Sequence, residues 1–144
     1  MRVRFPLPAP FGFCGGGNMT SKEKGNIALG RCIQYFTSLG FIVLLPLNDA
    51  QDYDIAIDNG KTIDKIQVKY TSQKQKSNYY ICKLYTCGHK DANGKQYEKP
   101  INYNNIDYFW FTNELNEDWL IPISELLNNR TITLNKDRDK FKVS

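Results

Sequence analysis

The sequence predicts an α+β fold: a mixed β-sheet meander with an N-terminal helix packed on it. Three patterns support this fold class. A capped helix begins near Thr20, alternating apolar residues surround an Asn-Gly pair at positions 59 and 60, and further short apolar runs follow, separated by turns. The 144 residues suffice for one hydrophobic core and not for two. We therefore expect residues 19–144 to form a single domain.

Residues 1–18 are not expected to belong to that domain. They contain Pro6, Pro8, Pro10 and three consecutive glycines, which disfavour any regular element. Two interpretations stay open: the segment is a disordered leader, or Met19 is the natural start of the protein. A signal peptide is not expected, because the prolines interrupt the apolar segment that it would need.

The first element is a helix over residues 20–39. Thr20 and Glu23 form the Thr-x-x-Glu pattern of a capping box, and Gly40 supplies the stop. Glu23 therefore has a structural explanation as the capping partner. Apolar residues at helical spacing form a stripe that we expect to be buried. Its members are Ile27, Ala28, Cys32, Ile33, Tyr35, Phe36 and Leu39.

The remaining elements follow from apolar runs and turn signals. Residues 41–45 are uniformly apolar, which favours a strand buried on both faces. Residues 86–105 are rich in Asn, Gly, Lys and Tyr, and we expect a long loop there that is either functional or disordered. The other predictions are strands over 79–85, 106–112, 118–123 and 131–134, a helix over 125–128 capped by Ser124, and a charged tail over 135–144.

The central hairpin, residues 53–71, is the most informative stretch of the chain. Asn-Gly between two alternating runs predicts a two-residue type I′ turn, here flanked by Asp58 and Lys61. In that register Asp54 lies opposite Lys65 and is a diagonal neighbour of Gln67, roughly 7–8 Å away.

The alternation of this hairpin separates a polar face from an apolar face. Asp54, Lys65, Gln67 and Lys69 share the polar face, because directly opposite residues project to the same side of a sheet. The apolar face, which we expect to contact the core, consists of Ile55, Ile57, Ile66, Val68 and Tyr70.

A carboxylate, an amide oxygen and a lysine on one face indicate a candidate site that cleaves phosphodiesters. Asp54 and Gln67 are near enough to converge on one hard cation, for which oxygen is the preferred ligand atom. The alternative interpretation is that these side chains are the solvated face of an ordinary amphipathic hairpin, since antiparallel sheets often face water on one side.

Asp54, followed thirteen residues later by Gln67-Val68-Lys69, resembles the PD-(D/E)xK nuclease superfamily. The pattern is most similar to a small branch in which glutamine replaces the second acid, and which includes intron-encoded homing endonucleases. The resemblance spans residues 20–134 and implies a restriction-endonuclease-like core. It also implies a Mg²⁺-dependent DNA endonuclease that hydrolyses phosphodiester bonds, of the sequence-specific homing type. The presence of both Asp54 and Lys69 favours catalysis. The alternatives are a Holliday-junction-resolving or restriction-type nuclease and a non-catalytic DNA-binding module.

The resemblance also implies roles for individual residues. Asp54, the Gln67 side-chain oxygen and the Val68 carbonyl would hold Mg²⁺. Lys69 would contact the scissile phosphate and orient the attacking water. Glu23 would bind a second cation or a water bound to the metal, in addition to or instead of its capping role. Glu23, Asp54, Gln67 and Lys69 are therefore the predicted catalytic residues.

Charge and composition agree with a nucleic-acid partner. The net charge is +4, and residues 61–99 contain nine lysines against three acidic residues. A solvated lysine-rich surface would have the same composition. We expect the protein to bind double-stranded DNA through lysines of the basic middle segment. We also expect it to be a homo-oligomer. The candidate DNA-binding residues are Lys74, Lys76, Lys90, Lys95 and Lys99.

Cysteine usage and hydropathy indicate a cytoplasmic protein without a membrane segment. The longest apolar run, residues 41–45, is too short to span a bilayer. The cysteines have no disulfide-framework spacing, so a reduced state is expected. Cys82, Cys87 and His89 are of the types that bind zinc, but their spacing fits no common site.

Overall fold

A computed structural model describes residues 19–48, 50–90, 92–127 and 129–143, with only the backbone described for 86–90 and 96–100. The leader expected over residues 1–18 lies outside the described residues. None of the helices in the described ranges is long and apolar enough to cross a membrane.

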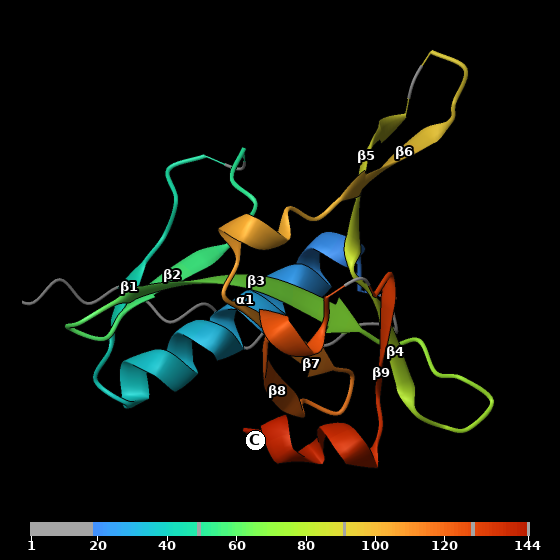
Figure 1. Ribbon diagram of the computed structural model, residues 1–144. Coiled ribbons are helices and arrows are strands. Elements are labelled where there is room, and N and C mark those ends of the chain that lie inside the picture. The colour runs from blue at the N-terminus through green and yellow to red at the C-terminus, as the bar shows by residue number, and fades with distance from the viewer. Residues whose placement is uncertain (1–18, 49, 91, 128, 144) are drawn as a thin grey trace, which may run out of the picture.

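The central layer is a five-stranded mixed sheet with the strand order β1-β2-β3-β7-β8 (Figure 1). Strands β3 and β7 are parallel, and the other neighbouring pairs are antiparallel. Helix α1 packs on one face of this sheet, so the predicted α+β class, with an N-terminal helix on a mixed sheet, is confirmed. The elements are α1 (Ser21–Ser38), β1 (Ile42–Leu44), β2 (Ile55–Asp58), β3 (Ile63–Thr71), β7 (Tyr108–Asn113) and β8 (Asp118–Pro122).

Helix α1 begins and ends where the sequence predicts. Thr20 is its N-cap and forms the capping box with Glu23, and Gly40 follows the C-cap with a φ of 81°. The predicted buried stripe is correct for Ala28, Cys32 and Phe36 but wrong for Leu39, whose exposed fraction is 55%. Leu39 is the C-cap, where the chain turns away from the helix axis, so its side chain leaves the stripe.

The first core lies between α1 and the sheet. It is built from Cys32 and Phe36 of the helix and from Ile55, Ile66 and Trp110 of the strands. The ring centroids of Phe36 and Trp110 are 6.2 Å apart, within the range of a favourable aromatic pair. The even-numbered residues of β3 and β7 therefore face α1, as the apolar face of the central hairpin predicts.

Strand β1 differs from its prediction. It is the edge strand of the sheet, and only Val43 points toward the core, whereas Ile42 is 61% exposed. The expected burial on both faces is therefore wrong. An uninterrupted apolar run does not reveal whether a second layer covers its outer face, and α1 covers one face only.

The turn of the central hairpin also differs. Asp58 pairs with Ile63 instead of Lys61, so the loop spans residues 59–62 and is not a two-residue type I′ turn. Asn59 is not among the residues with positive φ, which a type I′ turn requires at both central positions, whereas Gly60 has a φ of 83°. The Asn59 side chain accepts hydrogen bonds from the Lys61 and Thr62 amides, both at 2.9 Å, and this stabilises the wider loop.

The second face of the sheet is covered by a smaller sheet of β4 (Tyr80–Lys83) and β9 (Thr131–Leu134). Phe109, Phe111 and Ile121 of the central sheet pack with Leu84 and Leu126 in a second core on this side. The polar face of the central hairpin is thus partly covered, and Gln67 is only 8% exposed. An ordinary solvated face does not describe it.

The prediction of a long loop over residues 86–105 is wrong. Most of it is a hairpin of β5 (Tyr85–Lys90) and β6 (Gln96–Pro100), followed by the 3₁₀ turn η1 (Tyr103–Asn105). Gly94, with a φ of 77°, lies in the connection. Asn93-Gly94 between two β-prone runs is a turn signal that would have found this hairpin. The hairpin projects away from the rest of the molecule (Figure 1).

The C-terminal segments pack against the sheet more closely than predicted. The helical turn η2 (Ile123–Glu125) contains Ser124 instead of being capped by it, so the capped helix predicted over 125–128 is not found in its described part. The expected charged tail forms the 3₁₀ helix η3 (Lys136–Phe141). Phe141 packs on the second core and Val143 on the first.

A buried ion pair connects α1 to β8. Asp118, 2% exposed, accepts hydrogen bonds from Arg31 Nη2 at 2.6 Å and Thr112 Oγ1 at 2.6 Å. The Trp110 indole donates in turn to Thr112 Oγ1 at 2.9 Å. This network fixes the helix relative to the strands that carry the polar cluster described next.

Candidate active site

The candidate site lies at a free edge of strand β3. Ile55, the first residue of β2, pairs with Ile66, and β3 continues to Thr71 without a β2 partner. Asp54 immediately precedes β2, and its amide donates to the Ile66 carbonyl at 3.0 Å. The end of β2 therefore places Asp54 beside the exposed part of β3, where Gln67 begins.

Asp54 and Gln67 are in direct contact. Asp54 Oδ2 accepts hydrogen bonds from Gln67 Nε2 at 2.5 Å and from the Val68 amide at 2.7 Å. The prediction that Asp54 and Gln67 share a face is borne out by this contact. The predicted diagonal arrangement is wrong, because the register shift of two residues places Gln67 opposite Asp54.

This contact orients the amide of Gln67. An ionised carboxylate can only accept hydrogen bonds, so the amide nitrogen must face Asp54 and the oxygen Oε1 must point elsewhere. Asp54 Oδ1 and Gln67 Oε1 accept no hydrogen bond from any described residue. In the described ranges, Trp119 Nε1 is the side-chain polar atom that is both fully buried and without a hydrogen-bond partner. Because Asp54 Oδ1 and Gln67 Oε1 also have no such partner, neither of them is fully buried. Each oxygen therefore keeps at least a small exposed area, although Gln67 as a whole is only 8% exposed.

The Val68 carbonyl adds a third oxygen on the same side. Amide and carbonyl of one residue point to the same edge of a strand, and the Val68 amide faces Asp54 beyond the last β2 pair. The donor set of carboxylate, amide and carbonyl oxygens fits a hard divalent cation that keeps several waters. Among the described side chains, no group of three or more His, Cys, Asp or Glu residues is placed to hold a metal ion.

Burial raises the pKa of the Asp54 carboxyl above its ordinary value of 3.8. The hydrogen bond from the Val68 amide and the positive charge of Lys69 act in the opposite direction. The charge of Lys69 is thus felt at Asp54, as their predicted placement on one face requires. An ionised Asp54 with a desolvation cost gains more from a bound cation than a fully hydrated carboxylate would.

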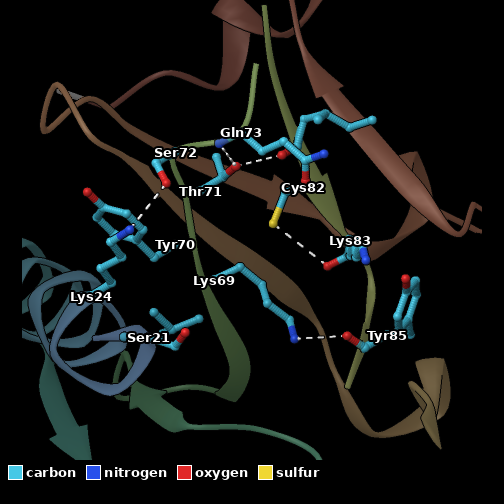
Figure 2. A pocket seen from close by; sticks show the side chains of 13 residues that line it. Ser21, Lys24, Lys69, Tyr70, Thr71, Ser72, Gln73, Cys82, Lys83 and Tyr85 are labelled. Carbon is cyan, nitrogen blue, oxygen red and sulfur yellow. Dashed lines mark hydrogen bonds between the residues drawn. The ribbon is translucent and has the colours of Figure 1, made fainter. Parts of the chain in front are cut away.

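Lys69 lies in a cleft of about 540 Å³ between the first turn of α1, the free edge of β3 and strands β4 and β5 (Figure 2). Its Nζ atom points toward the Tyr85 carbonyl at 3.5 Å, the limit of a hydrogen bond. The lining residues are Ser21, Lys24, Gly25, Val68, Lys69, Tyr70, Thr71, Ser72, Gln73, Ile81, Cys82, Lys83 and Tyr85.

Two further lysines of this cleft are absent from the sequence-based predictions. Lys24 comes from α1 and Lys83 from β4, on opposite sides of Lys69 (Figure 2). The only feature of the sequence that could have indicated Lys24 is its position directly after Glu23, in the first turn of the helix. Lys83 alternates with buried residues on β4, but nothing in the sequence indicates that β4 flanks β3.

Glu23 is positioned by its cap. Its carboxylate accepts hydrogen bonds from the Thr20 amide at 2.7 Å and hydroxyl at 2.8 Å, and these bonds lower the pKa of Glu23. The described residues that line the cleft include its neighbours Ser21 and Lys24 but not Glu23. The structure therefore brings Asp54, Gln67 and Val68 into contact. Lys69 is near enough for its charge to act on Asp54, but it lines the cleft, whose described lining does not include Asp54, Gln67 or Glu23.

The predicted DNA-binding lysines lie in different surroundings. Lys74 is paired with Glu114 at 3.5 Å and lies over the Tyr80 ring, while Lys76 is exposed. Lys95 is exposed in the β5–β6 connection. The side chains of Lys90 and Lys99 lie outside the described residues. The same holds for Cys87 and His89, which, like Cys82, are of the types that bind zinc; Cys82 itself is buried.

The fold is that of the restriction-endonuclease-like proteins. The sequence model of the PD-(D/E)XK endonuclease family matches residues 19–142, and the chain belongs to this family. The superfamily resemblance is thereby confirmed. PD-(D/E)XK nucleases typically use divalent metal ions and act on DNA.

A solved structure supports the fold assignment. The bacterial homing endonuclease I-Ssp6803I has a TM-score of 0.74 with this protein over 86% of this chain and 89% of that chain. The two sequences are 22% identical, so this likeness shows the fold alone. Among curated proteins none matches the chain.

Proposed function

We propose that this protein is a Mg²⁺-dependent, sequence-specific homing endonuclease acting on double-stranded DNA. The observation that carries the proposal is the contact of Asp54 with Gln67 at the free edge of β3. It leaves Asp54 Oδ1 and Gln67 Oε1 without a hydrogen bond from the described residues, on a strand whose Lys69 carries a charge that acts on Asp54. The homing role rests on the likeness in fold to I-Ssp6803I and on the glutamine in place of the second acid.

Asp54, Gln67 and the Val68 carbonyl would hold the cation. Magnesium suits this set because it prefers oxygen ligands and retains waters, so that few protein ligands suffice. When bound, a divalent cation neutralises charge at the phosphate and lowers the pKa of water. The Val68 amide and Gln67 Nε2 fix the orientation of the Asp54 carboxylate through its other oxygen.

Lys69 would act on the scissile phosphate. Its ammonium group donates hydrogen bonds to a phosphate oxygen, neutralises charge that develops during hydrolysis and orients the attacking water. The contact with the Tyr85 carbonyl is weak, so little is lost when the side chain turns to a phosphate.

Glu23 would contribute a second negative charge at the edge of this site. It lies in the first turn of α1, next to Ser21 and Lys24, which line the cleft. Its hydrogen bonds to Thr20 keep the carboxylate ionised, because they lower its pKa. Binding of a cation or of a water near Asp54 is compatible with capping, since a carboxylate has more acceptor positions than Thr20 occupies.

DNA would be held by lysines around the cleft and on the projecting β5–β6 hairpin. Lys95 lies in its connection, and Lys90 and Lys99 belong to its strands. Lys76 is available on the surface, whereas Lys74 would have to leave Glu114. Cutting both strands of a duplex in a single binding event takes two active sites, so we propose that the protein acts as a homo-oligomer.

The test compares Lys69→Ala with Lys65→Ala. Lys65 is the matched control, because it lies on the same strand and face but contacts the Tyr53 ring instead of the cleft. Cleavage of duplex libraries with randomised sequences is measured in Mg²⁺ and in a chelator. We expect sequence-specific cleavage by the wild type and Lys65→Ala in Mg²⁺ only. We expect no cleavage by Lys69→Ala, although its melting temperature is unchanged and it still binds duplex DNA.

Three results would overturn the proposal. Cleavage by Lys69→Ala at the wild-type rate would remove Lys69 from the reaction. DNA binding by the wild type without cleavage in Mg²⁺ would identify a non-catalytic DNA-binding module, and cleavage confined to four-way junctions would identify a junction-resolving enzyme.

A further inference from the structure

We propose that Lys24 and Ser72 bind a second phosphate of the cleaved strand, next to the scissile phosphate at Lys69. The proposal rests on the proposed function, since it places the DNA strand along the same cleft. It assigns to Lys24, in the first turn of α1, a DNA-binding role that the sequence did not indicate.

The charge of the cleft identifies its ligand as a polyanion. Three lysines line it, Lys24, Lys69 and Lys83, and none of its described lining residues is acidic. The other polar hollows differ in this respect. The one beside β9, for example, places Glu125 and Asp137 next to its cations. A cleft whose described lining contains lysines and hydroxyls but no carboxylate suits successive phosphates of one strand.

Lys24 is directed into the cleft without a competing carboxylate. Its Nζ atom lies 3.4 Å from Ser72 Oγ and 5.9 Å from the centroid of the Tyr70 ring (Figure 2). No acidic residue of the described ranges forms an ion pair with it, in contrast to Lys74, Lys140 and Lys142. Both of its contacts are weak, so a phosphate can replace them at little cost.

Ser72 completes the phosphate site from a different element. It follows the last residue of β3, 48 positions from Lys24 in the sequence, and its hydroxyl is exposed. A serine hydroxyl donates to phosphate oxygens, as many protein–DNA backbone contacts do. The site therefore exists only because the end of β3 meets the first turn of α1.

The arrangement gives the bound strand a path. Lys69 is on β3, and Ser72, which contacts Lys24, follows the end of that strand, so the phosphate backbone would run along the cleft from Lys69 toward Ser72. Lys69 acts on the phosphate that reacts, whereas Lys24 holds one that does not. Contacts to a non-reacting phosphate bind substrate and transition state equally, and affect KM more than kcat.

The test compares Lys24→Ala with Lys22→Ala. Lys22 is in the same helical turn and exposed but does not line the cleft, so it controls for general charge. Duplex affinity is measured at several salt concentrations in a chelator, so that no cleavage occurs. We expect Lys24→Ala to bind at least about 5-fold more weakly and to reduce the salt slope by about 1, with Lys22→Ala close to wild type.

Further variants keep the test decisive. Lys24→Gln preserves side-chain length if Lys24→Ala fails to fold, and it should show the same loss. Lys24→Ala and Ser72→Ala should be non-additive in affinity, because both act on one phosphate. In Mg²⁺, the Lys24 variants should raise KM with kcat within about 2-fold of wild type.

The outcomes separate this proposal from the proposed function. Equal affinity and salt slope for Lys24→Ala, Lys22→Ala and wild type would overturn it, as would a loss of kcat without a loss of affinity. If the wild type binds DNA but never cleaves it, the proposed function fails, while the affinity measurements still decide the role of Lys24.

Discussion

Gln67→Glu tests the hydrogen bond on which the candidate site is built. Gln67 Nε2 donates to Asp54 Oδ2 at 2.5 Å, and a glutamate cannot make this bond unless it is protonated. The variant restores the acid that is usual in the superfamily, but in the metal-free protein it places two carboxylates against each other. We expect it to destabilise the metal-free fold and to bind a divalent cation more tightly.

The magnitude follows from the surroundings of the pair. A hydrogen bond to a charged acceptor contributes roughly 1.5–3 kcal/mol, and Gln67 is only 8% exposed, so solvent replaces little of it. A chain of 144 residues changes its melting temperature by about 3 °C for each kcal/mol. We therefore expect Gln67→Glu to melt about 5–9 °C below the wild type near neutral pH in a chelator.

The pH dependence has a definite sign. The pKa of Asp54 is already raised above 3.8 by burial, and a second carboxylate raises it further. A carboxyl whose pKa is higher in the folded state binds protons preferentially there, so its cost is largest above the folded pKa and disappears as pH falls toward 3.8. The difference between variant and wild type should shrink as pH falls through the raised pKa.

The assay is thermal unfolding followed by circular dichroism, with Mg²⁺ titrated at neutral pH. Mg²⁺ should raise the melting temperature of Gln67→Glu more than that of the wild type, because a cation stabilises the state to which it binds. Gln67→Met, of similar shape but without donor or ligand oxygen, should be destabilised and not rescued. A Gln67→Glu protein that melts like the wild type in the chelator would refute the hydrogen bond. Equal Mg²⁺ shifts for both proteins would refute the role of Gln67 as a ligand.

Other changes address the cap, the ion pair and the DNA contacts. Glu23→Gln retains the capping box, so the melting temperature should be unchanged; a fall in kcat would assign the charge of Glu23 to the reaction, and unchanged kcat would leave it a cap. Asp118→Ala leaves Arg31 without its carboxylate and should cost about 2–4 kcal/mol in urea unfolding, whereas a cost below about 1 kcal/mol would contradict the buried network. Replacing the hairpin lysines together by alanine should lower the salt slope of DNA binding by up to about 3, and an unchanged slope would place the interface elsewhere. These lysines are Lys90, Lys95 and Lys99.

The sequence determined the features that depend on local periodicity. The Thr20–Glu23 box defined the start of α1, because capping involves residues within one turn. The shared face of Asp54, Gln67 and Lys69 was predictable although the turn between the strands was not. A shift of two residues preserves the alternation of side chains, so a wrong register still gave the right face.

The tertiary structure decided everything that depends on long-range pairing. The parallel pairing of β3 with β7 and the cover of β4 and β9 bury Gln67, and no local pattern specifies such partners. The early end of β2 leaves the edge of β3 open beside Asp54. Lys24 and Ser72, 48 residues apart, meet only because α1 packs across that open edge. Contacts of this kind depend on which surfaces are buried together, and the sequence encodes that only through the whole fold.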